Sequence, residues 1–387
     1  MKVALLAEYP LRPDRPHGGI EELTRRFASA LARQSGAEVH VVSFHGSVPD
    51  GPNPVVHDGV TIHRGEHPTK FGNLTFRYAE RRRTADVIRR LAPDVIHAFG
   101  IGAKALAAAD TGIPWVPTVN GFQTNEARDA GGLKNYLRMQ VFRRLEDESL
   151  RRAKTIIVPN PVVKEMLGRR GDHAKLLVIE NAVDRRFFDM PAVDPADPAA
   201  RPVTRIVCVG RLLTHKRPEN LIDAVARLGP AGKDLHVRWV GPPDRPGYLE
   251  ALRERVRANG LEGRFDFLGF VSDDELYAEV EAAGLLVHPS AVEVAPLAVM
   301  QGMAAGLPVL ATDVGGTRYQ VRDRETGRLV PKDDVPALAE ALQWLISDPA
   351  RAAALGAAGR REAAERFRLE RTVEKTLEAY EIALAAR

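Results

Sequence analysis

Short apolar runs alternate with amphipathic stretches along most of this chain. Residues 3–7, 205–209 and 285–288 form apolar runs with the length of buried strands, and residues 20–33 place apolar side chains at helical spacing. Regular alternation of strands and helices predicts parallel sheets covered by helices, which is an α/β fold. The alternation pauses at residues 189–203, which are rich in Pro, Ala and Asp, and then begins again. The pattern therefore predicts two sheets joined by a linker.

The length of 387 residues also favours two domains, because a single core rarely grows that large. We expect a first Rossmann-like domain over residues 1–189, a linker over 190–204, a second Rossmann-like domain over 205–368, and a last helix over 369–387. Open parallel sheets bind ligands at the carboxyl ends of their strands. Candidate functional residues are therefore those that directly follow a predicted strand.

Residues 285–316 contain the first such candidate. A predicted strand is followed by a loop with Glu293, and Pro296 then precedes a helix of small and apolar residues that ends at Gly306. The amides of Leu297 and Ala298 lie in the first turn of that helix, where free N–H groups and the helix dipole suit a phosphate. An ordinary crossover with a surface glutamate fits this stretch equally well.

The second candidate is Gly210-Arg211-Leu212 with Lys216, which follows a predicted strand and precedes a helix opened by Pro218. Arginine offers a planar fork to two phosphate oxygens, and lysine offers a compact positive charge. Fixed cations of this kind stabilise the negative charge that develops on a departing diphosphate. The alternative is a loop with two solvated cations. The sequence thus indicates two phosphate-compatible loops about 80 residues apart.

Composition limits the class of protein. Apolar residues make up 44% and charged residues 27% of the chain, as in soluble globular proteins. No run of about 18 apolar residues predicts a membrane-spanning helix, and the first ten residues resemble a strand rather than a signal peptide. Cys208, the single cysteine, lies in an apolar run and is expected in the core. We therefore expect a cytoplasmic protein.

The charge is unevenly distributed along the chain. Residues 1–190 carry 29 Lys and Arg against 22 Asp and Glu, whereas residues 191–387 carry 26 against 29. Arginines gather in two predicted helices, at residues 77–91 and 133–152. This basic first half is compatible with peripheral contact to the inner face of a membrane, although solvated helix faces explain it more simply. No nucleic-acid partner is expected.

The two candidate loops together resemble the retaining glycosyltransferases of the GT-B fold, family 4, also called glycosyl transferases group 1. That family has a Glu, seven residues, a second Glu, and then Ala-Met-Ala, a small residue, Gly, any residue and Pro-Val. Here Glu293 is followed by Gln301 and then by the run from Gly302 to Val309, GMAAGLPV. The Gly-Arg-Leu…Lys motif is similar to the family's signature as well. The resemblance spans nearly the whole chain and is strongest over residues 205–330.

The resemblance implies two Rossmann-like parallel-sheet domains facing across a cleft. It also implies transfer of a sugar from a nucleotide diphosphate donor, most commonly UDP, without a metal or another cofactor. The chain has no Asp-X-Asp triplet, which is the metal-binding motif of the other glycosyltransferase fold. The acceptor stays open among a saccharide, a lipid-linked molecule and a small molecule.

The family's roles are transferred to matching positions only. Arg211 and Lys216 would hold the diphosphate, Glu293 the sugar hydroxyls and Gln301 the ribose. Asn120 occupies the position of a cleft histidine near the transferred sugar. The other predicted donor-binding residues are Gly18, Gly19, Gly210, Val271, Ala295, Pro296, Leu297 and Ala298. The predicted acceptor-binding residues are Gln123, Asn125 and Glu126.

Three positions depart from the family pattern. Asn120 replaces a His, Gln301 replaces a Glu, and Tyr319 replaces a Glu that usually follows Gly315-Gly316. Gln301 keeps one carbonyl acceptor for a ribose hydroxyl, and Asn120 can still hydrogen-bond a sugar although it cannot titrate. These departures leave open an alternative, a catalytically silent GT-B protein that binds a nucleotide sugar or a partner. A nucleotide-sugar epimerase fits the motifs less well.

Overall fold

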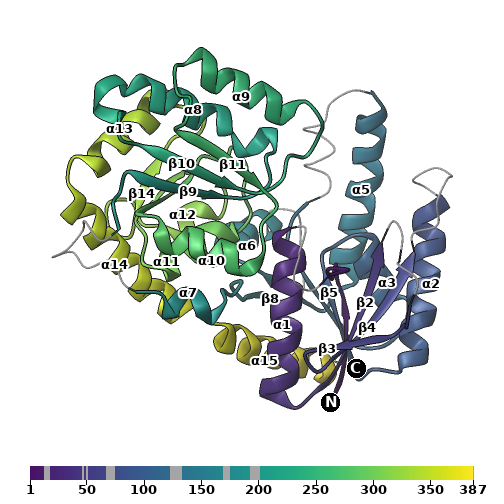
Figure 1. Cartoon of the computed structure of the whole chain (residues 1–387). Coiled ribbons are helices and arrows are strands. Elements are labelled where there is room, and N and C mark those ends of the chain that lie inside the picture. Colours follow the sequence, from purple (N-terminus) through teal and green to yellow (C-terminus); the bar gives the residue numbers. More distant parts are fainter. Residues whose placement is uncertain are drawn as a thin grey trace. The chain divides into compact units, whose positions relative to one another are not determined.

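The computed structural model describes residues 1–12, 18–45, 48, 51–66, 75–122, 133–168, 175–191 and 201–386. The chain forms two compact units. Unit 1 comprises Met1–Glu180 with Leu369–Arg387, and unit 2 comprises Asn181–Arg368. The division thus falls at residue 180, nine residues before the expected boundary. Figure 1 shows both units as sheets with helices packed on them.

Unit 1 contains an eight-stranded sheet in the order β3-β4-β2-β1-β5-β6-β7-β8. Its strands are β1 (Lys2–Leu6), β2 (Glu38–His45), β3 (Val55–His57), β4 (Val60–Glu66), β5 (Val95–Phe99), β6 (Trp115–Thr118), β7 (Thr155–Val158) and β8 (Lys175–Val178). Its helices in the described residues are α1 (Gly19–Ser35), α2 (Thr75–Leu91), α3 (Ala103–Ala109), α5 (Leu133–Arg152), α6 (Pro161–Gly168) and α15 (Leu369–Ala385).

Helices cover both faces of the unit 1 sheet. One apolar core joins α1 and α15 to the strands, and a second joins α2 and α3 to the opposite face. Figure 1 shows α15, in yellow, beside α1. Thr372 fastens the start of α15, since its hydroxyl donates to the carbonyl of Glu180 at 3.0 Å. The C-terminal helix therefore belongs to the core of unit 1.

One strand of unit 1 runs against the rest. β3 pairs antiparallel with β4 through the two-residue turn Asp58-Gly59, and both turn residues have positive φ (49° and 77°). Asp-Gly is a preferred sequence for such a hairpin turn. This hairpin was not among the predicted elements, although the Asp-Gly pair was a usable signal.

Unit 2 contains a six-stranded parallel sheet in the order β11-β10-β9-β12-β13-β14. Its strands are β9 (Arg205–Val209), β10 (His236–Val240), β11 (Phe265–Gly269), β12 (Leu285–His288), β13 (Val309–Thr312) and β14 (Arg328–Val330). Its α-helices in the described residues are α7 (Arg185–Asp189), α8 (Pro218–Arg227), α9 (Tyr248–Ala258), α10 (Asp273–Ala282), α11 (Leu297–Ala304), α12 (Thr317–Gln320), α13 (Val335–Ile346) and α14 (Pro349–Arg366).

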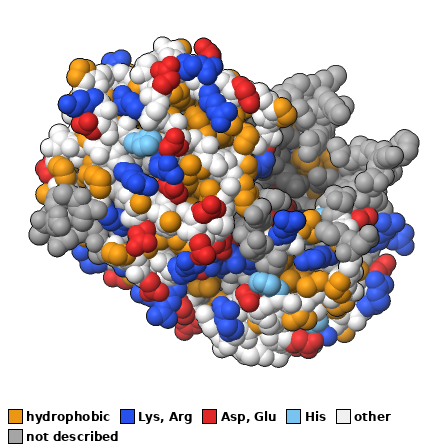
Figure 2. Space-filling view, viewed as in Figure 1, with side chains coloured by type: hydrophobic (Ala, Val, Ile, Leu, Met, Phe, Trp, Pro, Cys, Tyr) orange, Lys and Arg blue, Asp and Glu red, His pale blue; other side chains and the backbone are white. Residues whose placement is uncertain are grey.

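Two apolar cores sandwich the unit 2 sheet, one with α8, α9 and α13 and the other with α7, α10 and α11. A capping box begins α10, because Ser272 and Glu275 each accept a hydrogen bond from the other's backbone amide. Cys208 is buried, as expected. On the face seen in Figure 2, basic and acidic side chains are intermingled over unit 2.

The expected linker lies only partly in the described residues, which omit residues 192–200. Arg201, at its end, is buried in unit 2. Its guanidinium donates to the carbonyls of Ala283, Ala305 and Val280 at 2.9, 3.0 and 2.6 Å. These carbonyls lie at the ends of α10 and α11, so Arg201 is a structural residue of unit 2. Burial lowers the pKa of its guanidinium to about 10.

Candidate active site

The strand order of unit 2 marks one crevice as the ligand position. From β9 the chain runs outward to β10 and β11, and it then returns to place β12 on the other side of β9. At such a switch point the loops after neighbouring strands separate and leave a crevice at the carboxyl edge. The loop from Gly210 to Lys216 follows β9, and the loop from Pro289 to Pro296 follows β12. Both sequence candidates therefore border the same crevice.

A buried ion pair joins these two loops. Lys216 Nζ lies 2.5 Å from Glu293 Oε1, and only 18% and 9% of the two side chains are exposed. The backbone supports this pair, since the amide of Ala291 donates to the carbonyl of His215 at 2.7 Å. Charge-assisted hydrogen bonds of this length are among the strong ones in proteins. The structure thus brings together two predicted site residues that are 77 positions apart.

Glycine geometry lets Lys216 reach Glu293. Gly210 has φ +146°, and a Cβ added to it would lie 3.8 Å from Lys216 Cε, so the lysine side chain passes over this residue. Gly241, which follows β10, packs closely against the backbone of Gly210. A Cβ added to Gly241 would lie 2.2 Å from the carbonyl oxygen of Gly210. The two glycines therefore keep the surface beneath Lys216 free of side chains.

A third residue, His288, completes the group and was not among the predicted site residues. It is the last residue of β12, and its Nε2 lies 2.7 Å from the same Glu293 Oε1. Ser290 Oγ lies 3.2 Å from that nitrogen. An ionised carboxylate only accepts hydrogen bonds, so we assign the proton to His288 Nε2. The available signal was a polar residue at the carboxyl end of a buried strand.

Glu293 stays ionised in this setting. Burial alone would raise the pKa of its carboxyl group, but the charge of Lys216, together with His288 and the hydrogen bonds from both, outweighs burial and holds that pKa well below its usual range. Lys216 and His288 both contact Oε1, and no hydrogen bond to Oε2 is found among the described residues. The second carboxylate oxygen is therefore available to accept hydrogen bonds from a bound molecule.

A cavity of about 690 Å³ adjoins Glu293 at the ends of β13 and β14. Both apolar and charged residues line this cavity. Two of the charged residues form an ion pair, in which Arg318 Nε lies 3.0 Å from Asp313 Oδ1. The remaining lining residues are Ala291, Val292, Val314, Gly315, Asp323, Leu329, Val330, Pro331 and Lys332. A cavity with apolar walls and a few polar groups is the usual form of a small-molecule site.

Gly315 packs against the backbone of Glu293 beside this cavity. It has φ +47°, and a Cβ added to it would lie 1.8 Å from the carbonyl oxygen of Glu293. We therefore expect Gly315→Ala to lower the free energy of unfolding by about 2 to 4 kcal/mol, from backbone strain plus displacement of the Glu293 loop. Urea unfolding measures this loss.

Gly260→Ala is the matched control for Gly315→Ala. Gly260 also has positive φ (+64°), but an added Cβ would meet no atom within 4 Å. This variant should lose only the strain contribution, about 1 kcal/mol. Equal losses in the two variants would show that the close approach to Glu293 does not constrain the loop.

Arg211 has a different environment from Lys216. Its side chain is 45% exposed, and Nη2 lies 2.5 Å from Asp244 Oδ1, in the loop after β10. The other cation of this region, Arg217, is paired with Asp333 at 2.6 Å. The structure thus joins Lys216 to Glu293 directly, while Arg211 lies at the rim with a carboxylate partner of its own.

Helix α11 begins where the sequence predicted it, with Pro296 as its N-cap. In the described part of the chain, no hydrogen bond is donated by the amides of Leu297 and Ala298. Ala295 precedes the cap in the same loop. Gln301 is buried on α11, and Val271 lies in the loop after β11, half-buried against the core. All of these predicted residues are located at or next to the carboxyl edge of the unit 2 sheet.

The remaining predicted residues belong to unit 1. Gly18 is the N-cap of α1 and Gly19 its first residue, and a Cβ on either would meet no atom within 4 Å. Asn120 follows β6, and both polar atoms of its side chain are buried without a hydrogen-bond partner among the described residues. Gln123, Asn125 and Glu126 lie outside the described residues.

Tyr319, the third departure from the family pattern, lies on α12 and contacts Arg366. The Arg366 guanidinium lies 4.5 Å from the centre of the Tyr319 ring, and its Nη2 donates to the Tyr319 carbonyl at 3.0 Å. This contact is a cation–π interaction that fastens α12 to α14. In the described residues, no group of three or more His, Cys, Asp or Glu side chains is arranged to hold a metal ion.

Comparison with known proteins identifies the two halves. The family model described as Glycosyltransferase Family 4 matches residues 17–187, and the one described as Glycosyl transferases group 1 matches residues 198–362. A D-inositol 3-phosphate glycosyltransferase from Rhodococcus opacus is 38% identical over 185 residues, which are 46% of this chain and 41% of that protein. The matched part therefore spans about two fifths of that relative.

Two further proteins are similar over longer stretches. A GDP-mannose-dependent alpha-(1-6)-phosphatidylinositol monomannoside mannosyltransferase from Mycobacterium tuberculosis is 30% identical over 235 residues, covering 52% of this chain and 60% of that protein. The structure of sucrose-phosphate synthase from Thermosynechococcus elongatus superposes with a TM-score of 0.84 at 24% identity, covering 100% of both chains. With the two family models matched in succession, the chain belongs to the GT-B glycosyltransferases of the glycosyl transferases group 1 kind.

Proposed function

We propose that this protein transfers a sugar from a nucleotide diphosphate donor to an acceptor, with retention of anomeric configuration. The buried group of Lys216, Glu293 and His288 at the switch point of unit 2 is the observation that carries this proposal. It combines a cation for a diphosphate with an ionised acceptor for sugar hydroxyls, next to a cavity of about 690 Å³.

Each element of the site has a role in the proposal. Lys216 and Arg211 hold the diphosphate, and the free amides of Leu297 and Ala298 add the positive end of α11. Glu293 accepts hydrogen bonds from the sugar through its unused oxygen, and Gln301 accepts one from the ribose. In unit 1, Gly18 and Gly19 have no steric reason to be glycine among the described residues, which supports close contact with a bound group. The unpartnered Asn120 amide supports a ligand there.

The nucleotide is proposed to be UDP, the common donor in the family. The GDP-mannose dependence named for the Mycobacterium tuberculosis relative makes GDP the alternative. The acceptor is open, and the inositol phosphate and phosphatidylinositol named for the two relatives give the first compounds to test. No divalent metal is proposed, because Lys216 and Arg211 supply the positive charge that the leaving group needs. Addition of EDTA should therefore leave the transfer rate unchanged.

A donor screen by thermal shift tests this function. A ligand that binds only the folded protein stabilises it by mass action, by about 2.7 kcal/mol at a hundredfold excess over its Kd. We expect one nucleotide sugar among UDP, GDP and ADP sugars to raise the melting temperature and then to be consumed when acceptors are added. Binding without turnover over a broad acceptor panel would favour the catalytically silent alternative. Absence of binding would contradict the transferase and would leave only the form of that alternative that binds a partner.

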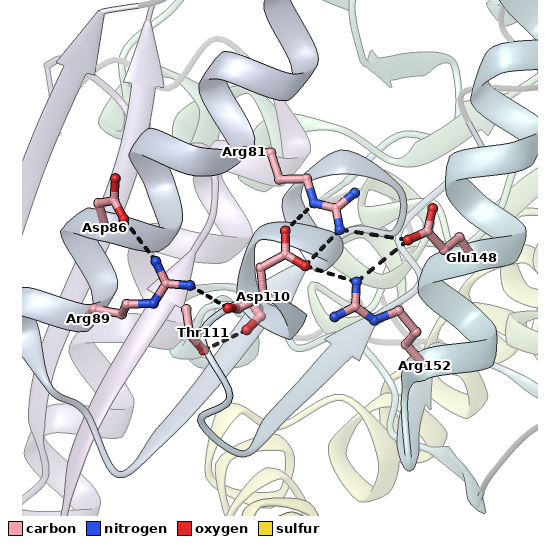
Figure 3. A network of polar contacts seen from close by, with 8 residues as sticks. Arg81, Asp86, Arg89, Asp110, Thr111, Glu148 and Arg152 are labelled. Atoms are coloured by element: carbon pink, nitrogen blue, oxygen red, sulfur yellow. Dashed lines mark hydrogen bonds and ion pairs between the residues drawn. The ribbon is translucent and has the colours of Figure 1, made fainter.

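The basic helices of unit 1 are the basis for proposed contact with anionic lipid. Not every arginine is free, because Asp110, the C-cap of α3, lies between Arg81 of α2 and Arg152 of α5 (Figure 3). Its Oδ1 accepts from both guanidinium groups, at 2.7 and 2.9 Å. The exposed arginines of α2 and α5 that have no carboxylate partner among the described residues are Arg82, Arg83, Arg90, Arg144 and Arg151.

Vesicle sedimentation tests this contact. The protein should bind vesicles that contain phosphatidylserine more strongly than pure phosphatidylcholine vesicles, and Arg82→Glu with Arg83→Glu should weaken binding because each arginine near an anionic surface contributes about 1 kcal/mol. Arg227→Glu with Arg253→Glu, at exposed arginines of α8 and α9 in unit 2, is the charge-matched control. Equal binding of both vesicle types would contradict a lipid contact. In the described residues, no helix is long and apolar enough to cross a bilayer.

A further inference from the structure

His288 has the geometry of a residue that acts on a ligand through Glu293. Its ring is 5% exposed, and its Nε2 is 2.7 Å from Glu293 Oε1 and 3.2 Å from Ser290 Oγ. His288 therefore has no free face toward the cavity, and the residues that line the cavity include Glu293 but not His288. A group in this position cannot contact a sugar directly, but it can determine where the carboxylate points and how strongly its charge is compensated.

We propose that His288 is a positioning residue. It holds the Glu293 carboxylate in place while Lys216 donates one of its N–H groups to the donor diphosphate. This inference rests on the proposed function. Lys216 and His288 both contact Oε1, so the carboxylate is clamped at one oxygen and its other oxygen is left for the ligand. An ammonium group has three N–H donors, and it can contact Glu293 and a phosphate oxygen together.

The electrostatic reason for a second partner is the donor's own charge. A diphosphate beside Lys216 competes with Glu293 for the same ammonium group, and it adds negative charge next to a buried carboxylate. Without His288, Lys216 would be the only hydrogen-bond partner of the Glu293 carboxylate among the described residues, and a buried charge that loses a partner is costly. His288 therefore lets the site hold a carboxylate and a diphosphate at the same time.

The test separates binding of the sugar from binding of the nucleotide. The dissociation constants of the nucleotide sugar found in the donor screen and of the corresponding nucleoside diphosphate are measured by calorimetry. Wild type should bind the nucleotide sugar more tightly than the nucleoside diphosphate. In His288→Leu, the affinity for the nucleotide sugar should fall by about tenfold to a hundredfold, as expected for loss of a hydrogen bond to a charged group. The affinity for the nucleoside diphosphate should fall much less.

Two further variants make the result specific. His288→Gln keeps an N–H donor near the position of Nε2 and should restore most of the lost affinity. His236→Leu removes a different histidine–carboxylate pair of unit 2, His236 with Asp266 at 3.1 Å, and should leave both constants unchanged. Melting temperatures of all variants identify any that are misfolded. If His288→Leu is among them, His288→Asn takes its place and should show the same loss, because its shorter side chain cannot put an N–H donor at the position of Nε2.

The outcomes distinguish the inference from the proposed function. If wild type binds no nucleotide sugar, the proposed function is contradicted. If wild type binds the nucleotide sugar and a folded His288→Leu binds it equally well, His288 has no positioning role. An equal loss for the nucleotide sugar and the nucleoside diphosphate would also overturn the inference, because it would show a general disturbance of the site.

Discussion

Replacing Lys216 by alanine should lower the rate of sugar transfer by about 10²- to 10³-fold, as expected for loss of one group that stabilises charge in a transition state. The leaving diphosphate gains negative charge as the sugar bond breaks, and Lys216 is a poorly exposed cation in the crevice between β9 and β12. Steady-state kinetics with the nucleotide sugar identified by the donor screen measure this loss. Most of it should appear in kcat, because the charge develops during the reaction.

The neighbouring residue provides a matched control for Lys216. Arg217 follows Lys216 directly, but its guanidinium is paired with Asp333 at 2.6 Å, and 36% of its side chain is exposed against 18% for Lys216. Arg217→Ala removes the same charge from the chain and should leave the rate near that of wild type. A similar loss in both variants would indicate a general electrostatic effect rather than a contact by Lys216.

The Lys216→Ala variant also leaves Glu293 without its cation, and a buried carboxylate that loses its partner can destabilise the fold by about 3 to 5 kcal/mol. The double variant Lys216→Ala with Glu293→Gln removes both charges together, and it should fold even if the single variant does not. It should be as inactive as the single variant. Wild-type activity in either folded variant would remove Lys216 from the proposed mechanism.

The stability of unit 1 should fall steeply in acid because of His97. This residue lies on β5 at the centre of the sheet and is fully buried, with Nδ1 2.8 Å from Tyr380 Oη of α15 and Nε2 2.6 Å from Thr118 Oγ1. Burial lowers the pKa of His97 to about 3, against about 6.5 for an unfolded chain. The folded protein therefore keeps this ring neutral at pH values where the unfolded chain would bind a proton.

The direction of the pH effect follows from these two values. The contribution of His97 to the free energy of unfolding is fully present above pH 6.5. It decreases as the pH falls, because the unfolded state takes up a proton that the folded state does not, and it is lost near pH 3. The total is on the order of 4 to 5 kcal/mol, and about 2 kcal/mol of it should be lost between pH 8 and pH 5. Urea unfolding at these two pH values measures the loss.

His97→Gln is the variant that isolates this effect. Glutamine can hydrogen-bond Tyr380 and Thr118 but does not titrate, so the variant should lose about 2 kcal/mol less than wild type between pH 8 and pH 5. The same pH dependence in His97→Gln and wild type would mean that His97 is not held neutral.

A variant with a single tryptophan can restrict the fluorescence measurement of unfolding to unit 1. Trp115 lies on β6 of unit 1, whereas Trp239 and Trp344 lie in unit 2. With Trp239→Phe and Trp344→Phe, the remaining tryptophan reports unfolding of unit 1 alone. This matters because a protein of two compact units can unfold in more than one step.

Local sequence patterns were sufficient for most elements and for the outline of the site. The strand β12 and the start of α11 were predicted from an apolar run, a proline and a following glycine, because these residues act on the backbone directly. Short elements were missed. The strand β14 has only three residues, Arg328–Val330, and is specified by pairing with β13 rather than by its own pattern.

The sequence alone determined the α/β class, the two loops that contain Arg211 and Glu293, and the family, because each depends on residues close together in the chain. Only the tertiary structure revealed that Lys216 contacts Glu293, that Asp244 pairs with Arg211, and that His288 shares the carboxylate oxygen with Lys216. These contacts depend on how parallel strands are ordered in the sheet. That order is set by packing over the whole unit, and periodicity within one segment does not encode it.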